Sequence, residues 1–308
     1  MSDPLADIVS LLNPKPSHSK FVEASGQWHV ARESGGEAFY CAVLQGECLI
    51  SVDNQSSKKL AAGDFILIPA AHSFRNTNVT HHPLHNITIP TVKGKGHIRL
   101  GDNEGPAELL MHVGHCQFDT PDKQLIVSLL PKEILIKGQQ RIVTLVELLR
   151  DESRTQRPGR DVVMKQLLQL LLIESLRNDQ QISQPSGVLR GLQHPKISTA
   201  LHLIHESPGA DWQIAQLAMQ VAMSRSSFFA TFNDVVGIPP MQYLLFWRMS
   251  LGKNALMTGN EKIEQIAFQI GYKSASAFSV AFTKYVGVAP SEFRRQCVPF
   301  ADQEDDEE

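Results

Sequence analysis

Hydrophobic positions repeat in the last third of the chain, in the same order and at nearly the same spacing. Residues 217–240 carry an apolar stripe, then two Phe residues four apart, then Gly and Pro, and residues 266–290 carry the same series. The offset between the copies is 49 residues in the first half of each segment and 50 in the second. Repetition of this kind is typical of one supersecondary unit used twice.

Each copy predicts a short helix, a tight turn and a second helix. In the first copy Leu217, Ala218 and Val221 belong to an i, i+3, i+4, i+7 series that marks one apolar helix face. The Phe pairs of the second helices, at positions 228/232 and 278/282, fall one helical turn apart and predict a buried face. This arrangement is a helix-turn-helix, whose second helix can lie in the DNA major groove.

The residues at the ends of these helices support the same interpretation. Ser224 and Ser274 are placed to cap the second helices, because a Ser oxygen accepts a hydrogen bond from an unpaired backbone N–H. Gly271 suits a tight turn that needs a positive φ, whereas Ala222 does not, so we expect the first turn to have a different shape. Gly at 237 and 287 and Pro at 240 and 290 predict where one helix stops and the next begins. Residues 240–258 then predict one helix that joins the two units.

Together these residues resemble the AraC/XylS transcription regulators. The resemblance covers residues 194–296 and rests on the two apolar stripes, the two Phe pairs, the two Gly–Pro endings, Tyr243-Leu244, Arg248-Met249 and Phe293-Arg294. It implies two helix-turn-helix subdomains on one linker helix, with both recognition helices in successive major grooves of double-stranded DNA. It also implies RNA polymerase as a further partner.

The recognition helices depart from that family at one point. Its members often carry Arg two residues before the second Phe, where this chain has Ala230 and Val280. Because Arg to guanine is the commonest specific base contact, we expect A·T-tolerant recognition that depends mainly on phosphate contacts. The residues expected to face DNA are Arg225, Ser226, Ser227, Phe229 and Thr231 in the first unit, and Lys273, Ser274, Ser276, Ser279, Thr283 and Lys284 in the second.

Residues 20–130 show a different pattern, of short apolar runs broken by Gly, Asn, Ser and Pro. Runs at 39–44 and 48–52 predict two strands around a Gly46 turn, and a third run from Phe65 is expected to end at Pro69, which cannot donate to a ladder. Residues 81–92 and 108–116 predict further strands. Many short antiparallel strands favour a sandwich or barrel of jelly-roll type.

Two motifs in this region resemble a cupin-type sensor barrel. They are Gly63-Asp64-Phe65 with Pro69, His72 and Phe74, and the segment 114–119. Enzyme cupins hold a metal through a His-x-His pair, but this chain has Ala38-Phe39-Tyr40 near that position, so we predict neither metal nor cofactor. A small-molecule pocket is expected instead. Its candidate residues are Phe39, Cys41, Cys48, His72 and Phe74. His112 and His115, three apart on a strand, are expected to face opposite sides.

Two helices are predicted between these regions, at 134–151 and 161–177. The second is apolar almost all round and must be covered on every side. Either both faces are covered within the chain, or one face pairs with a second copy in a homodimer. The polar segment 178–191 predicts a linker.

These predictions give an α+β protein with four parts. They are a cupin-like effector-binding domain (1–130), a helical dimerisation and linker region (131–193), a DNA-binding domain (194–296) and an acidic disordered tail (297–308).

The DNA-binding domain carries nine Lys and Arg against six Asp and Glu, a modest excess for a DNA-binding domain. The last eight residues carry six acids, which predicts a solvating tail or one that competes with phosphate for the basic face.

Composition fits an ordinary cytoplasmic protein. No signal peptide and no membrane span are predicted, and the four Cys form no CxxC pair. The favoured function is a transcription regulator that responds to a small-molecule effector, with the sign of regulation left open. The alternatives are a metal-dependent cupin enzyme with an appended helical domain, and a regulator that acts mainly through protein partners.

Overall fold

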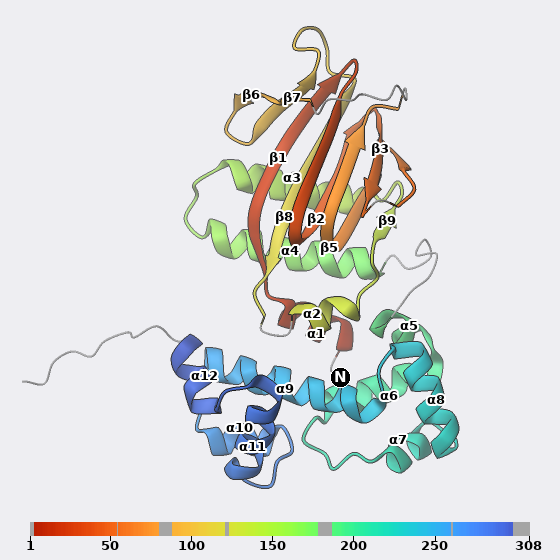
Figure 1. The fold of residues 1–308 in the computed structure, drawn as a ribbon, viewed down its shortest axis with the longest axis vertical. Coiled ribbons are helices and arrows are strands. Elements are labelled where there is room, and N and C mark those ends of the chain that lie inside the picture. Colours follow the sequence, from red (N-terminus) through yellow and green to blue (C-terminus); the bar gives the residue numbers. More distant parts are fainter. Residues whose placement is uncertain are drawn as a thin grey trace, which may run out of the picture. The chain divides into compact units, whose positions relative to one another are not determined.

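The chain forms two units, one built on a sheet and one built of helices (Figure 1). The computed structural model describes residues 3–53, 55–79, 88–120, 123–177, 187–259 and 261–297. The sheet unit comprises residues 8–185, and the helical unit comprises residues 1–7 with 186–308. The protein is therefore a mixed α+β protein, as the sequence predicted. The predicted acidic tail, apart from Cys297, and most of the predicted linker lie outside the described residues.

The sheet unit is built on one continuous sheet. Within the described residues its strand order is β4-β3-β5-β2-β8-β1-β7-β6, with β9 paired to β5. Most neighbours are antiparallel, and β1 pairs with β7 in parallel. The strands are β1 (Pro14–Ser25), β2 (His29–Gln45), β3 (Glu47–Val52), β4 (Lys58–Ala61), β5 (Phe65–Thr77), β6 (Thr91–Gly94), β7 (His97–Gly101), β8 (Leu109–Phe118) and β9 (Ile134–Ile136).

The sheet curves around a single apolar core. Leu60 of β4 and Leu100 of β7 lie near opposite ends of the strand order, yet both belong to one buried cluster with Phe39 and Met111. A flat sheet could not bring its two ends to the same cluster. The predicted barrel-like architecture is therefore confirmed, with side chains of alternate residues on each strand pointing inward.

The predicted strands on either side of Gly46 (φ +78°) are confirmed as β2 and β3, which pair not with each other but each with β5. The predicted end of the third strand is corrected. Pro69 does not end its strand, since β5 continues to Thr77. The pairing register shifts between Glu37 and Phe39, opposite Pro69, so the absent N–H falls at a bulge and breaks no ladder bond. Of the predicted strand 81–92, residues 81–87 lie outside the described residues, and β6 begins at Thr91.

Helices α3 (Gln140–Arg154) and α4 (Arg160–Arg177) pack on the sheet and belong to the sheet unit (Figure 1). The predicted helix 134–151 begins later than expected, because Ile134–Ile136 forms β9 and Gly138 (φ +61°) breaks the chain direction before α3. Two shorter helices, α1 (Pro4–Leu12) and α2 (Lys123–Ser128), complete the N-terminal part. The α4 face that includes Val162, Val163 and Leu170 is exposed.

The helical unit contains both predicted helix-turn-helix pairs, α7 with α8 and α10 with α11, joined by the single helix α9 (Figure 1). Its helices are α5 (Val188–Gln193), α6 (Pro195–Glu206), α7 (Ile214–Gln220), α8 (Arg225–Val236), α9 (Pro240–Thr258), α10 (Ile263–Gln269), α11 (Ala275–Val286) and α12 (Pro290–Cys297). Ser224 and Ser274 cap α8 and α11 as predicted, each accepting from the backbone N–H three residues on. Gly237 and Gly287 end these helices in the left-handed conformation.

The two turns have the same shape, which corrects the prediction for Ala222. Its φ is +50°, in the left-handed region that Gly271 also adopts at +89°. The same hydrogen bond closes each turn, from Met223 N to Ala218 O at 2.9 Å and from Tyr272 N to Ala267 O at 2.8 Å. Helix packing therefore imposes the conformation in both copies, and Ala222 accepts the strain that a Cβ brings there.

Exchanging these two residue types tests the strain. Ala222→Gly should raise the free energy of unfolding by about 0.5–1 kcal/mol, because Gly reaches a positive φ without the Cβ clash. Gly271→Ala should lower it by at least about 1 kcal/mol, since its Cβ would lie 2.6 Å from Arg248 Nη2 and 2.7 Å from Gly209 O. Urea unfolding of both variants measures the difference. A loss of stability in Ala222→Gly would contradict the strained-turn interpretation.

Candidate functional site

The helix α8 presents a polar outer face above a buried Phe pair. Phe228 and Phe232 are fully buried, so the turns between them point their other side chains away from the core. Of the residues predicted to face DNA, Arg225, Ser226, Ser227 and Phe229 are exposed and Thr231 is half-buried. Ala230, at the position where the resembling proteins often carry Arg, is also exposed.

The helix α11 repeats this arrangement above Phe278 and Phe282. The predicted residues Lys273, Ser274, Ser276, Thr283 and Lys284 are exposed, and Ser279 is half-buried. Two of the hydroxyls already have partners, because Ser274 caps the helix and Thr283 donates to Ser279 O at 2.7 Å. Val280 is 71% exposed, and an apolar side chain so exposed on this face is available to a thymine methyl group.

One helix, α9, supplies side chains to the cores of both helix-turn-helix pairs. Tyr243, in its first half, contacts Phe232 edge to face at 5.9 Å between ring centroids. Met249 and Leu256, in its second half, pack in the cluster of Phe278 and Phe282. Because both cores share one continuous helix, the directions of α8 and α11 are fixed relative to each other within the helical unit.

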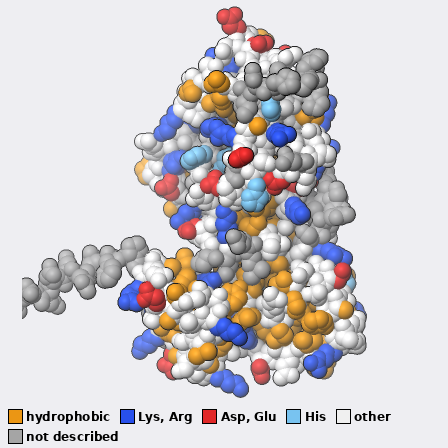
Figure 2. All heavy atoms as spheres, viewed as in Figure 1, with side chains coloured by type: hydrophobic (Ala, Val, Ile, Leu, Met, Phe, Trp, Pro, Cys, Tyr) orange, Lys and Arg blue, Asp and Glu red, His pale blue; other side chains and the backbone are white. Residues whose placement is uncertain are grey.

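Positive charge is dispersed on the face of the helical unit that Figure 2 shows. In the view of Figure 2, the blue Lys and Arg side chains of this unit lie singly among other residues and form no continuous patch. Part of the charge has a local partner, since Arg190 pairs with Asp234 at 2.9 Å and Arg248 donates to Pro208 O and Ala210 O. The dispersed charge agrees with the small excess of basic residues in the sequence.

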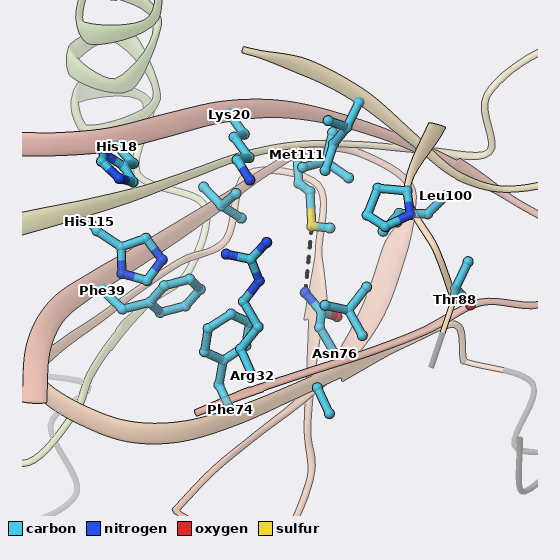
Figure 3. Close-up of a pocket in the computed structure, with 16 residues that line it drawn as sticks. His18, Lys20, Arg32, Phe39, Phe74, Asn76, Thr88, Leu100, Met111 and His115 are labelled. Atoms are coloured by element: carbon cyan, nitrogen blue, oxygen red, sulfur yellow. Dashed lines mark hydrogen bonds between the residues drawn. The ribbon is translucent and has the colours of Figure 1, made fainter. Parts of the chain in front are cut away.

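A cavity of about 200 Å³ opens into the interior of the sheet unit, and we call it the barrel cavity (Figure 3). Val22, Leu100 and Met111 give it an apolar wall that is continuous with the core. Asn76 is buried there, where its Nδ2 donates to Met111 Sδ at 3.5 Å and its Oδ1 has no partner. An unpaired buried acceptor favours a ligand that donates a hydrogen bond.

Basic groups gather in the same cavity. Figure 3 shows the Lys20 ammonium and the Arg32 guanidinium directed into the space between them, with His18 and His115 nearby. Burial lowers the pKa of Lys20, and the charge of Arg32 lowers it further. Burial also lowers the pKa of His115, although Glu37, 4.0 Å away, raises it in part. Two cations that face each other across a cavity are stabilised by an anion between them.

The structure brings together two of the five residues predicted for the ligand pocket. Phe39 and Phe74 line the barrel cavity and stack with ring centroids 4.6 Å apart. Cys41 and Cys48 lie in the closed core instead, where burial raises the pKa of both thiols. His72 is exposed and does not line the cavity, because the neighbouring Ala71 is the residue of β5 that packs into the core at this point.

Sequence reasoning missed the polar residues of this cavity. Lys20 alternates with Val22 on β1, and Arg32 alternates with Val30 on β2, so each shares the inward face of its strand. That period-two pattern was present in the sequence. A cation on an inward-facing strand position was the signal that could have found the site.

His112 and His115 point to opposite sides of β8, as predicted. His115 contacts Phe39 in the barrel cavity, with ring centroids 5.3 Å apart, whereas His112 stacks on Tyr40 at 5.9 Å. Among the described residues no group of three or more His, Cys, Asp or Glu side chains is placed to hold a metal ion. His81, His82 and His85 lie outside that part of the chain.

Comparison with known proteins gives the same division of the chain. Residues 3–179 match a family model described as Cupin, and residues 217–296 match one described as Helix-turn-helix domain. A putative AraC-like transcription regulator of Streptomyces lividans is 30% identical, over 95% of this chain and 98% of that protein. The HTH-type transcriptional regulator AlkR of Acinetobacter baylyi is 28% identical, over 96% of this chain and 99% of that protein.

Solved structures with some likeness include the DNA-binding domain of AdpA in complex with a target DNA. It is 23% identical and covers 32% of this chain and 89% of that one, with a TM-score of 0.31. Unsaturated fatty acid bound ToxT from Vibrio cholerae is 14% identical over 93% of this chain and 96% of that one, with a TM-score of 0.37.

No helix in the described part of the chain is both long and apolar enough to span a membrane.

The buried His112 makes stability depend on pH. Burial, with a further contribution from Arg150 and Arg154, lowers the pKa of His112 from 6.5 to about 4. Between these values the unfolded chain binds the proton and the folded chain does not, so acid favours unfolding. As the pH falls from 6.5 to 4, the stability should decrease by up to about 3 kcal/mol from this group. Urea unfolding of the wild type and of His112→Gln between pH 4 and 6.5 measures this contribution. If the free energy of unfolding changed with pH equally in both proteins, His112 would not be its source.

Proposed function

The chain belongs to the AraC-like transcription regulators, and on that premise we propose that it binds double-stranded DNA through α8 and α11 under control of a small molecule in the barrel cavity. The observation that carries the DNA-binding half is the pair of equivalent capped helices on one continuous α9. A helix of 19 residues is about 28 Å long, of the same order as one turn of DNA. Two helices held at such a spacing fit neighbouring major grooves on one face of the duplex.

The exposed residues of α8 and α11 divide into two kinds of contact. Arg225, Lys273 and Lys284 are the cations placed to neutralise phosphates, which fix position but read no sequence. Phe229 and Val280 are exposed apolar groups of the kind that contacts thymine methyl groups. With Ala230 where an Arg would read guanine, the proposed recognition tolerates A·T pairs and depends on phosphate contacts.

The barrel cavity supports a small organic acid as effector. Its walls are mostly apolar, and Lys20 and Arg32 face each other across it. A molecule with an apolar body and one carboxylate would place the carboxylate between the two cations and its body against Met111. This ligand would act by favouring one arrangement of the protein over another, through its different affinity for each.

Exposed apolar side chains on α3 and α4 support a partner for the sheet unit. Leu148, Val162 and Val163 leave apolar surface exposed on α3 and α4, which supports a homodimer formed through these helices. RNA polymerase is the partner expected of such a regulator, and the cytoplasm is the compartment in which it would work. We propose no catalytic role, since the relatives are named as regulators of transcription.

Replacing the proposed phosphate contacts should weaken DNA binding without changing sequence preference. Arg225→Ala and Lys273→Ala should each lower affinity about tenfold at moderate salt and reduce the slope of log affinity against log salt by about 1. Electrophoretic mobility shift or fluorescence anisotropy over a salt series measures both. Arg157→Ala, an exposed Arg of the sheet unit, is the matched control.

DNA binding with an unchanged salt slope in both variants would overturn the assignment of α8 and α11 to the duplex. A binding-site selection with the wild-type chain tests the proposed preference separately. We expect an A·T-containing consensus, and a G-rich consensus would contradict the proposal.

The effector proposal predicts a dependence on ligand charge. The probe pair is 4-phenylbutyrate and the uncharged 4-phenylbutan-1-ol, which share an apolar body. Lys20→Met and Arg32→Met should each weaken binding of the acid about tenfold or more and leave binding of the alcohol within about twofold. Isothermal titration calorimetry measures this, with Lys93→Met on exposed β6 as control. Equal loss for acid and alcohol, or tighter binding of the alcohol by the wild type, would refute an anionic effector.

A further inference from the structure

A second cavity, of about 360 Å³, lies where α3 and α4 meet the sheet, and we call it the helix-side cavity. β1, β2, β8 and the turn before β7 supply its other walls. It shares three wall residues with the barrel cavity, His18, Lys20 and His115. Four cationic side chains and one imidazole line the helix-side cavity alone: Lys95, Arg150, Arg154, Arg160 and His112.

The lining of this cavity is strongly one-sided in charge. Five Lys and Arg side chains line it, namely Lys95, Arg150, Arg154 and Arg160 together with the shared Lys20, and no Asp or Glu is among the described residues of the lining. Hydroxyl groups of Ser17, Ser19 and Ser153 add further hydrogen-bonding capacity. A concave surface lined by charges of one sign concentrates its field in the cavity and attracts ligands of the opposite sign.

Nearby carboxylates compensate these cations in part. Arg150 lies 3.0 Å from Asp151 Oδ1, and Arg160 lies 3.1 Å from Asp161 Oδ1. The side chains of Asp151 and Asp161 are 65% and 89% exposed, so solvent screens both pairs. Neither carboxylate lines the cavity, so its interior keeps a positive potential.

The Arg side chains are held in place before any ligand arrives. Arg160 donates from Nε to Glu152 O and from Nη2 to Ser153 O, both at 3.3 Å, near the C-terminal end of α3. Arg154 is placed over the Phe21 ring, with its guanidinium carbon 5.2 Å from the ring centroid. Donors fixed in this way lose little side-chain entropy on binding, which favours affinity.

His112 adds an independent observation, a buried polar atom without a partner in a residue that lines this cavity. The residue is 1% exposed, yet its Nδ1 has no hydrogen-bond partner among the described residues. Because a buried polar atom without a partner costs about 1–3 kcal/mol, such atoms are rare unless a ligand or water meets them. The neutral ring that burial favours can donate from Nδ1 to an oxygen of an anion.

We propose that the helix-side cavity is a second ligand site, which binds a small phosphorylated molecule. A phosphate monoester carries between one and two negative charges near pH 7 and three acceptor oxygens, which matches several cations with hydroxyls and an imidazole beside them. Arg150 and Arg154 contact the phosphate, His112 donates to one of its oxygens, and Lys95 closes the mouth. The ligand would tie α3 to β8 and to the turn before β7.

The test uses the full-length chain and inorganic pyrophosphate as probe, with citrate as a comparison anion of similar charge. In isothermal titration calorimetry we expect a submillimolar dissociation constant for pyrophosphate and weaker binding of citrate. Arg154→Gln should weaken pyrophosphate binding at least tenfold, and Lys95→Gln at least threefold. The matched controls Arg157→Gln and Lys93→Gln, exposed residues outside the cavity, should stay within about twofold of the wild type.

Several outcomes would overturn the proposal. They are pyrophosphate binding that is equal in all variants, binding that needs tens of millimolar probe, and citrate that binds more tightly than pyrophosphate. Lys95 lies in an exposed turn, so its variant tests the site even if Arg154→Gln unfolds. Arg154→Gln should also bind 4-phenylbutyrate as the wild type does, which separates this site from the effector proposal.

Discussion

The structure of the helical unit depends on one constraint, the sharing of α9 between two apolar cores. Tyr243 serves the first core and Met249 and Leu256 serve the second, so neither helix-turn-helix pair can change its direction without repacking the same helix. This constraint is strong enough to hold Ala222 in the left-handed conformation that Gly271 adopts easily. The cost of that strain is small beside the burial of four Phe side chains.

In the sheet unit the corresponding constraint is the closing of one sheet around its core. Closure fills most of the interior with apolar side chains but leaves the barrel cavity, where Lys20 and Arg32 point inward. On the outer side of the same sheet, α3 and α4 leave the helix-side cavity over His112. Met111 and His112 of β8 point to opposite faces of the sheet and line the barrel cavity and the helix-side cavity respectively, while His18, Lys20 and His115 border both.

How far the sequence predicted the site differs between the two units. In the helical unit the predicted DNA-facing residues, such as Arg225 of α8 and Lys284 of α11, are exposed, because the helical period and the Phe pairs fix the outer face locally. In the sheet unit Phe39 and Phe74 line the barrel cavity, but Cys41 and Cys48 do not. Which inward residues of a barrel line a void, and which pack in the core, depends on strands distant in sequence.

The sequence by itself determined the duplicated helix-turn-helix, its caps and turns, and the strand-rich N-terminal half, since all of these follow from periodicity and from Ser, Gly and Pro at fixed offsets. Tertiary structure decided the rest. It placed β5 between β2 and β3, carried β5 past Pro69 through a bulge and turned Ile134–Ile136 into β9. It also brought Lys20 beside Arg32, and Arg150 and Arg154 over His112. Such contacts join residues far apart along the chain, and no local pattern encodes them.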